Sequence, residues 1–127
     1  AVGTSSMYST TTGNDNTAVG WRSLYANTTG PQNVAVGKSA LVANTTGEAN
    51  TGIGYNAGLA ITTGTNNICI GQTAGDALTT GSNNSALGTG TAFSAVNVTN
   101  EIVIGSGRTG IASNTAFIGG TSGAYNF

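Results

Sequence analysis

Aliphatic residues recur along this chain at one fixed interval, and a glycine follows each of them. The pairs stand seventeen residues apart, at Val2-Gly3, Val19-Gly20, Val36-Gly37, Ile53-Gly54, Ile70-Gly71, Leu87-Gly88 and Ile104-Gly105. Two polar columns keep the same interval: Thr-Thr-Gly starts at Thr11, Thr28, Thr45, Thr62 and Thr79, and asparagine stands at Asn16, Asn33, Asn50, Asn67 and Asn84. A period that survives so many copies without an insertion is typical of coils that stack on one another.

The residues around each aliphatic position alternate as a β-strand requires. Thr17 and Val19 face one way in such a strand, and Ala18 and Gly20 face the other. We expect the aliphatic side to fill the inside of the coil, and the small side to lie against the backbone of a neighbouring chain. Thr-Thr-Gly predicts the turn between copies. Each glycine in a helix interior costs about 1 kcal/mol relative to alanine, so the pattern predicts an all-β fold, a parallel β-solenoid of seventeen-residue coils.

The regularity of the repeat divides the chain into three parts. Residues 1–92 carry the regular seventeen-residue copies. Residues 93–119 are degenerate, because Thr-Thr-Gly is missing there and the step from Ile104-Gly105 to Ile118-Gly119 is fourteen residues. Residues 120–127 carry no repeat signal and are predicted to be a transition segment or a cap. Since the first copy is already under way at Ala1, we expect the chain to be a piece of a longer protein.

The composition removes several classes of partner. The chain of 127 residues has three Lys and Arg, four Asp and Glu, no His and 21 Gly. Such sparse charge provides no basic patch for nucleic acid and no amphipathic surface for an anionic membrane. A composition rich in Gly, Ser, Thr and Asn also suits a disordered segment. The aliphatic ladder argues against disorder, because flexible linkers do not place apolar residues in register.

No catalytic constellation is visible, and we predict that the chain is not an enzyme and needs no cofactor. Its carboxylates lie in different copies, so no acid/base pair, triad or metal cluster forms. Asp15 among amides is more typical of an Asx turn than of a calcium turn. Residues 105–110 resemble a phosphate loop only superficially, because no helix follows. Cys69 stands in the Ala18 column, which predicts a small buried residue.

Aromatic residues are the candidate binding groups. Trp21 and Tyr55 share a column with Lys38 and Gln72, which indicates exposure to solvent. Tyr8 and Tyr25 share another column, which also admits an aspartate, Asp76. Exposed aromatics on a rigid scaffold stack on sugar rings or anchor a protein receptor. The more ordinary alternative is that these rings shield the coil edges or pack against a neighbouring chain.

Four sequons make glycosylation conceivable in a suitable host. The acceptor residues are Asn27, Asn44, Asn83 and Asn97. Because Asn and Thr are abundant throughout the chain, several such triplets are expected by chance.

The phrases Asn-x-Ala-Val-Gly and Asn-x-x-x-Ile-Gly, as at 16–20 and 114–119, resemble the YadA-like head repeats of trimeric autotransporter adhesins and bacteriophage tail fibres. The likeness extends over nearly the whole chain, and the fourteen-residue step is the usual one of that family. The seventeen-residue coils depart from it, which we interpret as the same coil with a turn three residues longer. The resemblance implies a left-handed β-roll, with three rolls side by side in a homotrimer.

Three functions remain open at this stage. The first is a non-enzymatic extracellular fibre segment, either an adhesin head or a virion tail-fibre shaft, which serves cell attachment or spacing and meets a glycan or protein receptor. The second is a structural filament that assembles from identical chains end to end. The third is an ice-binding solenoid. Adjacent threonines in an extended strand point to opposite sides, so only one of the two Thr columns is expected to face water.

Overall fold

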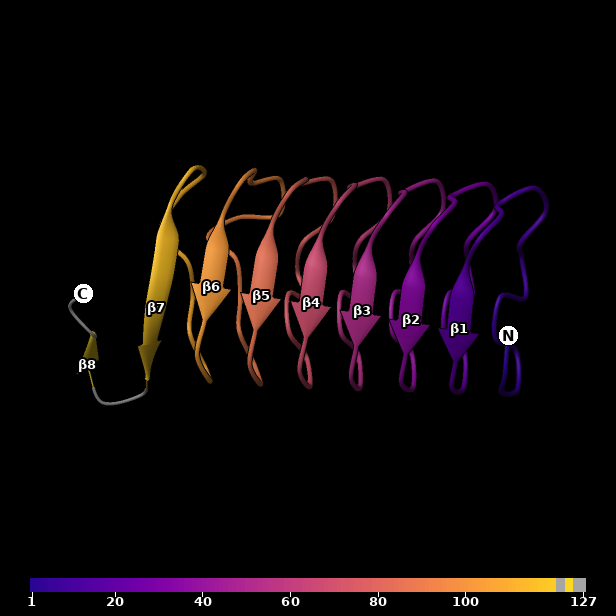
Figure 1. Cartoon of the computed structure of the whole chain (residues 1–127), viewed down its shortest axis with the longest axis horizontal. Helices are drawn as coiled ribbons and strands as arrows, with labels where there is room; N and C mark the ends of the chain where they lie inside the picture. Colours follow the sequence, from indigo (N-terminus) through magenta and orange to yellow (C-terminus); the bar gives the residue numbers. More distant parts are fainter. Residues whose placement is uncertain (121–122, 125–127) are drawn as a thin grey trace.

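The computed structural model describes residues 1–120 and 123–124, and these form a solenoid whose coils stack along one axis (Figure 1). Within them, eight strands make one sheet in chain order from β1 to β8. The strands are β1 (Thr17–Val19), β2 (Val34–Val36), β3 (Thr51–Ile53), β4 (Ile68–Ile70), β5 (Ser85–Leu87), β6 (Ile102–Ile104), β7 (Ala116–Gly120) and β8 (Gly123–Ala124). The predicted all-β parallel solenoid is confirmed.

The register of the sheet reproduces the period of the sequence. From β1 to β6 each strand pairs in parallel with the residues seventeen positions later, as in the pair Ala18↔Ala35. Between β6 and β7 the step is fourteen, because Val103 pairs with Phe117. Strand β8 pairs antiparallel to β7. The prediction of a transition segment or cap over 120–127 falls largely outside the described residues.

The three extra residues of the longer coil lie at its Thr-Thr-Gly corner. Ala92 still bridges to Thr109, seventeen residues on. By contrast, the Thr99 N–H donates to Ser113 Oγ at 3.1 Å, fourteen residues on. The shorter coil therefore lacks its three residues between Thr109 and Ser113, where earlier coils carry their Thr-Thr-Gly corner. This agrees with our interpretation of the seventeen-residue coil as a fourteen-residue coil with a longer turn.

The predicted orientation of the strands is wrong. The small column faces inward: Ala18, Ala35, Cys69 and Ala86 are buried together with Val103. The aliphatic column faces outward, and Leu87 is 45% exposed. The physical reason is the thinness of the coil. A Cβ added at Gly52 would lie 2.8 Å from Leu41 Cγ, so side chains from the opposite wall already occupy the space in front of the strand.

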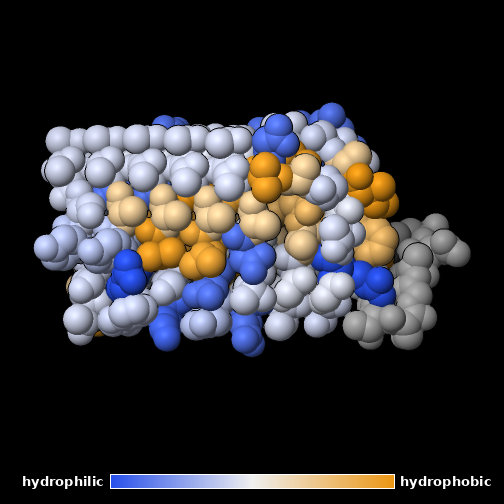
Figure 2. Space-filling view, turned by 180° about the vertical axis from the view of Figure 1, so that it is seen from behind, coloured by the Kyte–Doolittle hydropathy of each residue, from blue (hydrophilic) through white to orange (hydrophobic). Residues whose placement is uncertain are grey.

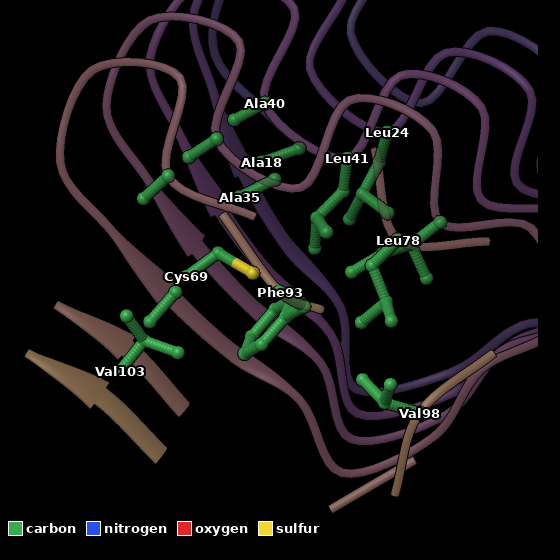
Figure 3. Packing of buried hydrophobic residues seen from close by; sticks show 14 residues of the cluster. Ala18, Leu24, Ala35, Ala40, Leu41, Cys69, Leu78, Phe93, Val98 and Val103 are labelled. Atoms are coloured by element: carbon green, nitrogen blue, oxygen red, sulfur yellow. The ribbon is translucent and has the colours of Figure 1, made fainter. Parts of the chain in front are cut away.

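The second segment of each coil therefore supplies the bulk of the core. Leu24, Leu41, Ile61 and Leu78 are all fully buried, and Figure 3 shows leucines and Phe93 pointing into the interior opposite the small strand residues. Small residues on one wall and large ones on the other fill the narrow interior, which is how protein cores reach crystal-like packing density.

Polar ladders run beside this apolar core. Asn33, Asn50, Asn67 and Asn84 are fully buried, and each side-chain oxygen accepts a backbone N–H from the next coil, as Asn50 Oδ1 does from Asn67 at 3.0 Å. The side-chain nitrogens of Asn33, Asn50 and Asn67 donate to glycine carbonyls, as Asn67 Nδ2 does to Gly81 at 2.8 Å, and that of Asn84 donates to Val98 O. Buried amides need such partners, so the regular asparagine column reports a structural ladder.

Candidate functional site

The outer face of the sheet carries a row of exposed apolar side chains along the described chain. Figure 1 shows β1 to β7 side by side along the stack, so their outward side chains form continuous rows. We call these residues the strand face. Its exposed apolar members are Val19, Ile53, Ile68, Leu87, Ile102 and Ile118, and half-buried Val34, Val36, Ile70 and Ile104 lie between them.

The strand face has almost no charge to keep it apart from other surfaces. Its remaining positions are Thr17, Thr51, Ser85 and Ala116, which are short and uncharged. Single exposed apolar residues are ordinary, but a contiguous apolar area larger than a few hundred Å² marks an interaction site. The strand face can therefore bind another flat apolar surface.

A second feature follows the strands at their carboxyl ends. Trp21 and Tyr55 are exposed, as predicted, and lie two coils apart in one column with Lys38 between them. The Lys38 ammonium lies 5.2 Å from the Trp21 ring centroid and 5.6 Å from that of Tyr55. A cation at this distance from an aromatic face is attracted to its π-electrons. The two rings and the ammonium are thus held as one unit.

The tyrosine column joins this unit from the next segment of the coil. Tyr8, 71% exposed, stacks on half-buried Tyr25 with ring centroids 5.3 Å apart. The Arg22 guanidinium lies over Tyr25 at 4.4 Å and over Trp21 at 5.2 Å. We call Tyr8, Trp21, Arg22, Tyr25, Lys38 and Tyr55 the aromatic cluster.

The sequence predicted the aromatic members of this cluster but missed its cations. Arg22 and Lys38 are two of the three basic residues in the chain, and their position in the same coils as the rings was the available signal. The tyrosine column ends at Phe93, which is buried.

Figure 2 shows that the side of the molecule opposite to the view of Figure 1 carries an apolar band along part of the stack, bordered by hydrophilic residues.

Two of the four sequons are inaccessible in the folded chain. Asn27 and Asn44 are fully buried, and their amide nitrogens donate to Gly30 O and Gly47 O at 3.0 Å. Both residues are therefore wrong candidates for glycosylation of the folded chain, because their amides serve the turn. Asn83 and Asn97 are exposed and remain candidates.

The two threonine columns have different roles. The first donates its hydroxyl across coils, as Thr45 Oγ1 does to Thr62 O at 3.1 Å. The second, which includes Thr46 and Thr63, is exposed. The second row is thus the more exposed of the two, and the hydroxyls of the first row are engaged by carbonyls of the next coil.

The remaining chemistry of the described residues is sparse. Within 1–120 and 123–124, no three His, Cys, Asp or Glu side chains come together as a metal site would require. Cys69 is buried, and its pKa is raised to about 12, chiefly by this burial and to a smaller extent by the charge of Asp76. Thiols react as thiolates, so this one is inert. Asp15 has a φ of 57°, which suits a turn residue.

Comparisons with protein-family models, with curated proteins and with solved structures find no match to this chain. In the part of the chain that the structure describes, no helix is long and apolar enough to cross a bilayer.

Proposed function

We propose that this chain is a segment of an extracellular fibre, in which identical solenoids pack side by side through the strand face and present the aromatic cluster to a receptor. The fibre is non-enzymatic and serves attachment or spacing, as an adhesin head or a virion tail-fibre shaft does. The single observation that supports this proposal is the uncharged apolar strand face.

The proposal differs from our first expectation in the surface that makes contact. The small column was expected to touch a neighbouring chain, but it lies inside the coil. The outward column is instead aliphatic, and burying apolar area contributes about 25 cal/mol per Å². Rows of valine, isoleucine and leucine along a straight stack suit a partner that has the same period, which another copy of this chain has by construction.

The number of copies and the location come from the resemblance to YadA-like head repeats. That resemblance implies three left-handed rolls around a common axis outside the cell. In an assembly of closed symmetry, the strand face of every copy is covered by a neighbouring copy. A rigid rod with few charges suits display at a distance from an anchor.

The test is the oligomeric state of the purified chain, measured by analytical ultracentrifugation. We expect a trimer, and we expect Ile53→Lys combined with Leu87→Lys to give a folded monomer, because charges cannot be buried unpaired at the contact. Gln72→Lys adds a charge at an exposed position of the turn after the strand and should leave the trimer intact. A wild-type chain that stays monomeric at high concentration would disprove the packing.

Display is tested separately from packing. Trp21→Ala combined with Tyr25→Ala should weaken attachment of the assembled fibre to cells or glycans at least tenfold, since buried aromatic anchors dominate such contacts. Gln72→Ala serves as the control on the same edge of the coil. Unchanged attachment would leave the segment as a spacer.

A further inference from the structure

We propose that the aromatic cluster binds a linear acidic polysaccharide that lies along the solenoid axis. This inference rests on the proposed function, because it names the chemical class of the receptor that the fibre meets. Three observations support it: the spacing of the rings, the placement of the cations and the absence of competing carboxylates.

The rings are spaced for a polymer. Trp21 and Tyr55 belong to coils that are two steps apart, so roughly 10 Å separates them when strands are 4.8 Å apart. Tyr8 extends the cluster by one further coil toward the amino terminus. The cluster therefore covers several units of an extended chain. The apolar faces of sugar rings pack on aromatic side chains of this kind.

The cations lie beside the rings, where they can meet the carboxylates of a bound polymer. Arg22 lies over the Tyr25 ring at 4.4 Å. A guanidinium that stacks on a ring keeps the N–H groups at its edge free for two parallel hydrogen bonds to a carboxylate. Lys38 lies midway between Trp21 and Tyr55. A polymer along the axis thus meets a ring, an ammonium and a second ring in succession.

Neither cation is neutralised within the described part of the chain. No carboxylate there lies within the 4.0 Å of an ion pair with Arg22 or Lys38. Asp15 and Glu48 belong to the turn that precedes the strand, and Asp76 lies three coils beyond Tyr25. An otherwise acidic chain, with a net charge of −1, therefore concentrates positive charge at its aromatic edge.

Binding to immobilised polysaccharides tests this inference directly. The acidic probes are polygalacturonate, hyaluronate and polysialate, and fully methyl-esterified polygalacturonate is the neutral match. We expect the assembled chain to bind at least one acidic probe. If that probe is polygalacturonate, we expect the acid form to bind at least tenfold more tightly than its methyl ester. Raising the salt from about 0.05 to 0.5 M should weaken this binding, because salt screens exposed charges.

Variants separate the contributions of charge and stacking. Arg22→Gln with Lys38→Gln should lower the affinity for the acidic probe at least tenfold, and Trp21→Ala with Tyr55→Ala should do the same. Gln72→Ala, in the Trp21 column but beyond the cluster, should bind as the wild type does. Thermal unfolding of each variant confirms that it is folded.

Three results would overturn the inference: no binding to any of the three acidic polysaccharides, equal binding to the methyl ester, or equal binding to polyglutamate, which has the charge without the sugar rings. Sedimentation of the same samples keeps the two proposals apart. A trimer that binds none of the probes removes the polysaccharide and leaves the fibre, whereas a monomer removes the fibre.

Discussion

At the scale of single residues, the glycine that follows each strand is required by its neighbours as well as by its backbone. Gly54 has a φ of 133°, which side chains rarely tolerate, and an added Cβ would lie 2.6 Å from Gly71 O in the next coil. Gly107 also has a positive φ, of 63°, but an added Cβ there meets nothing within 4 Å. The two positions therefore separate backbone strain from steric contact between coils.

We predict that Gly54→Ala destabilises the fold far more than Gly107→Ala does. The left-handed conformation costs alanine about 1 to 2 kcal/mol, which is the whole effect expected at Gly107. At Gly54 the added methyl group also forces two coils apart, and the backbone cannot shift without disturbing the ladder. Urea unfolding measures both variants, and equal midpoints would show that contact between coils does not constrain this column.

The buried thiol of Cys69 should make the stability of the fold depend on pH. Burial raises its pKa to about 12, whereas the thiol of the unfolded chain keeps the ordinary value of 9.0. The group therefore stabilises the fold fully below pH 9, and this contribution is lost as the pH rises toward 12, because only the unfolded chain can ionise. Relative to Cys69→Ala, the wild-type chain should lose about 1 to 2 kcal/mol between pH 7 and pH 10. Urea unfolding of both chains at each pH measures this difference. A constant difference would contradict the assignment of a buried thiol.

At the scale of elements, the asparagine ladder links each coil to the next through buried hydrogen bonds. Asn67 accepts a hydrogen bond from the Asn84 backbone at 3.1 Å and donates to Asn50 Oδ1 and Gly81 O. The ladder ends at buried Glu101, whose backbone N–H still donates to Asn84 Oδ1 at 2.9 Å. Its carboxylate turns toward Ser94, which ties down the irregular segment where the coils become shorter.

We predict that Asn67→Ala destabilises the solenoid by about 3 kcal/mol or more, because it leaves several buried polar groups without partners. Asn97→Ala is the matched control, since Asn97 is exposed, and should change the stability by less than about 0.5 kcal/mol. Chemical denaturation of both variants gives the comparison. Similar losses at the two sites would mean that the ladder follows the fold without holding it together.

The strands themselves could be predicted from the sequence, but the alternation within them does not fix the direction of their side chains. An alternation with period two is equally compatible with either face turned inward. The deciding information lies in the rest of the coil, where Leu24 and Leu41 already fill the interior. In the next two coils, Gly58 and Gly75 take the place of these leucines. Three residues after each glycine, Ile61 and Leu78 stand where the earlier coils have asparagine. Comparing these columns would have indicated that the strand must contribute the small side.

At the scale of the whole molecule, the period predicted both the architecture and the position of the aromatic cluster. Residues in one column must lie along one line, so Trp21 and Tyr55 could be placed together from the sequence alone. The contribution of Arg22 could not, because it comes from the neighbouring column, and the distance between columns depends on how the corner folds. The same period implies that one coil can be removed without changing the contacts of the others.

Deleting residues 36–52 tests that implication. The deletion joins Ala35 to Ile53, which keeps every later column in register and brings the coil of Leu24 against that of Ile61. We expect the shortened chain to unfold cooperatively, with a urea m-value lower by about one eighth in proportion to its length. Deleting residues 36–51 instead leaves Gly52 as an extra residue inside a three-residue strand, which should disrupt the sheet pairing. Circular dichroism and urea unfolding compare the two deletions. Equal stability would show that the solenoid tolerates a slip within its strands, and that the seventeen-residue register does not hold the stack together.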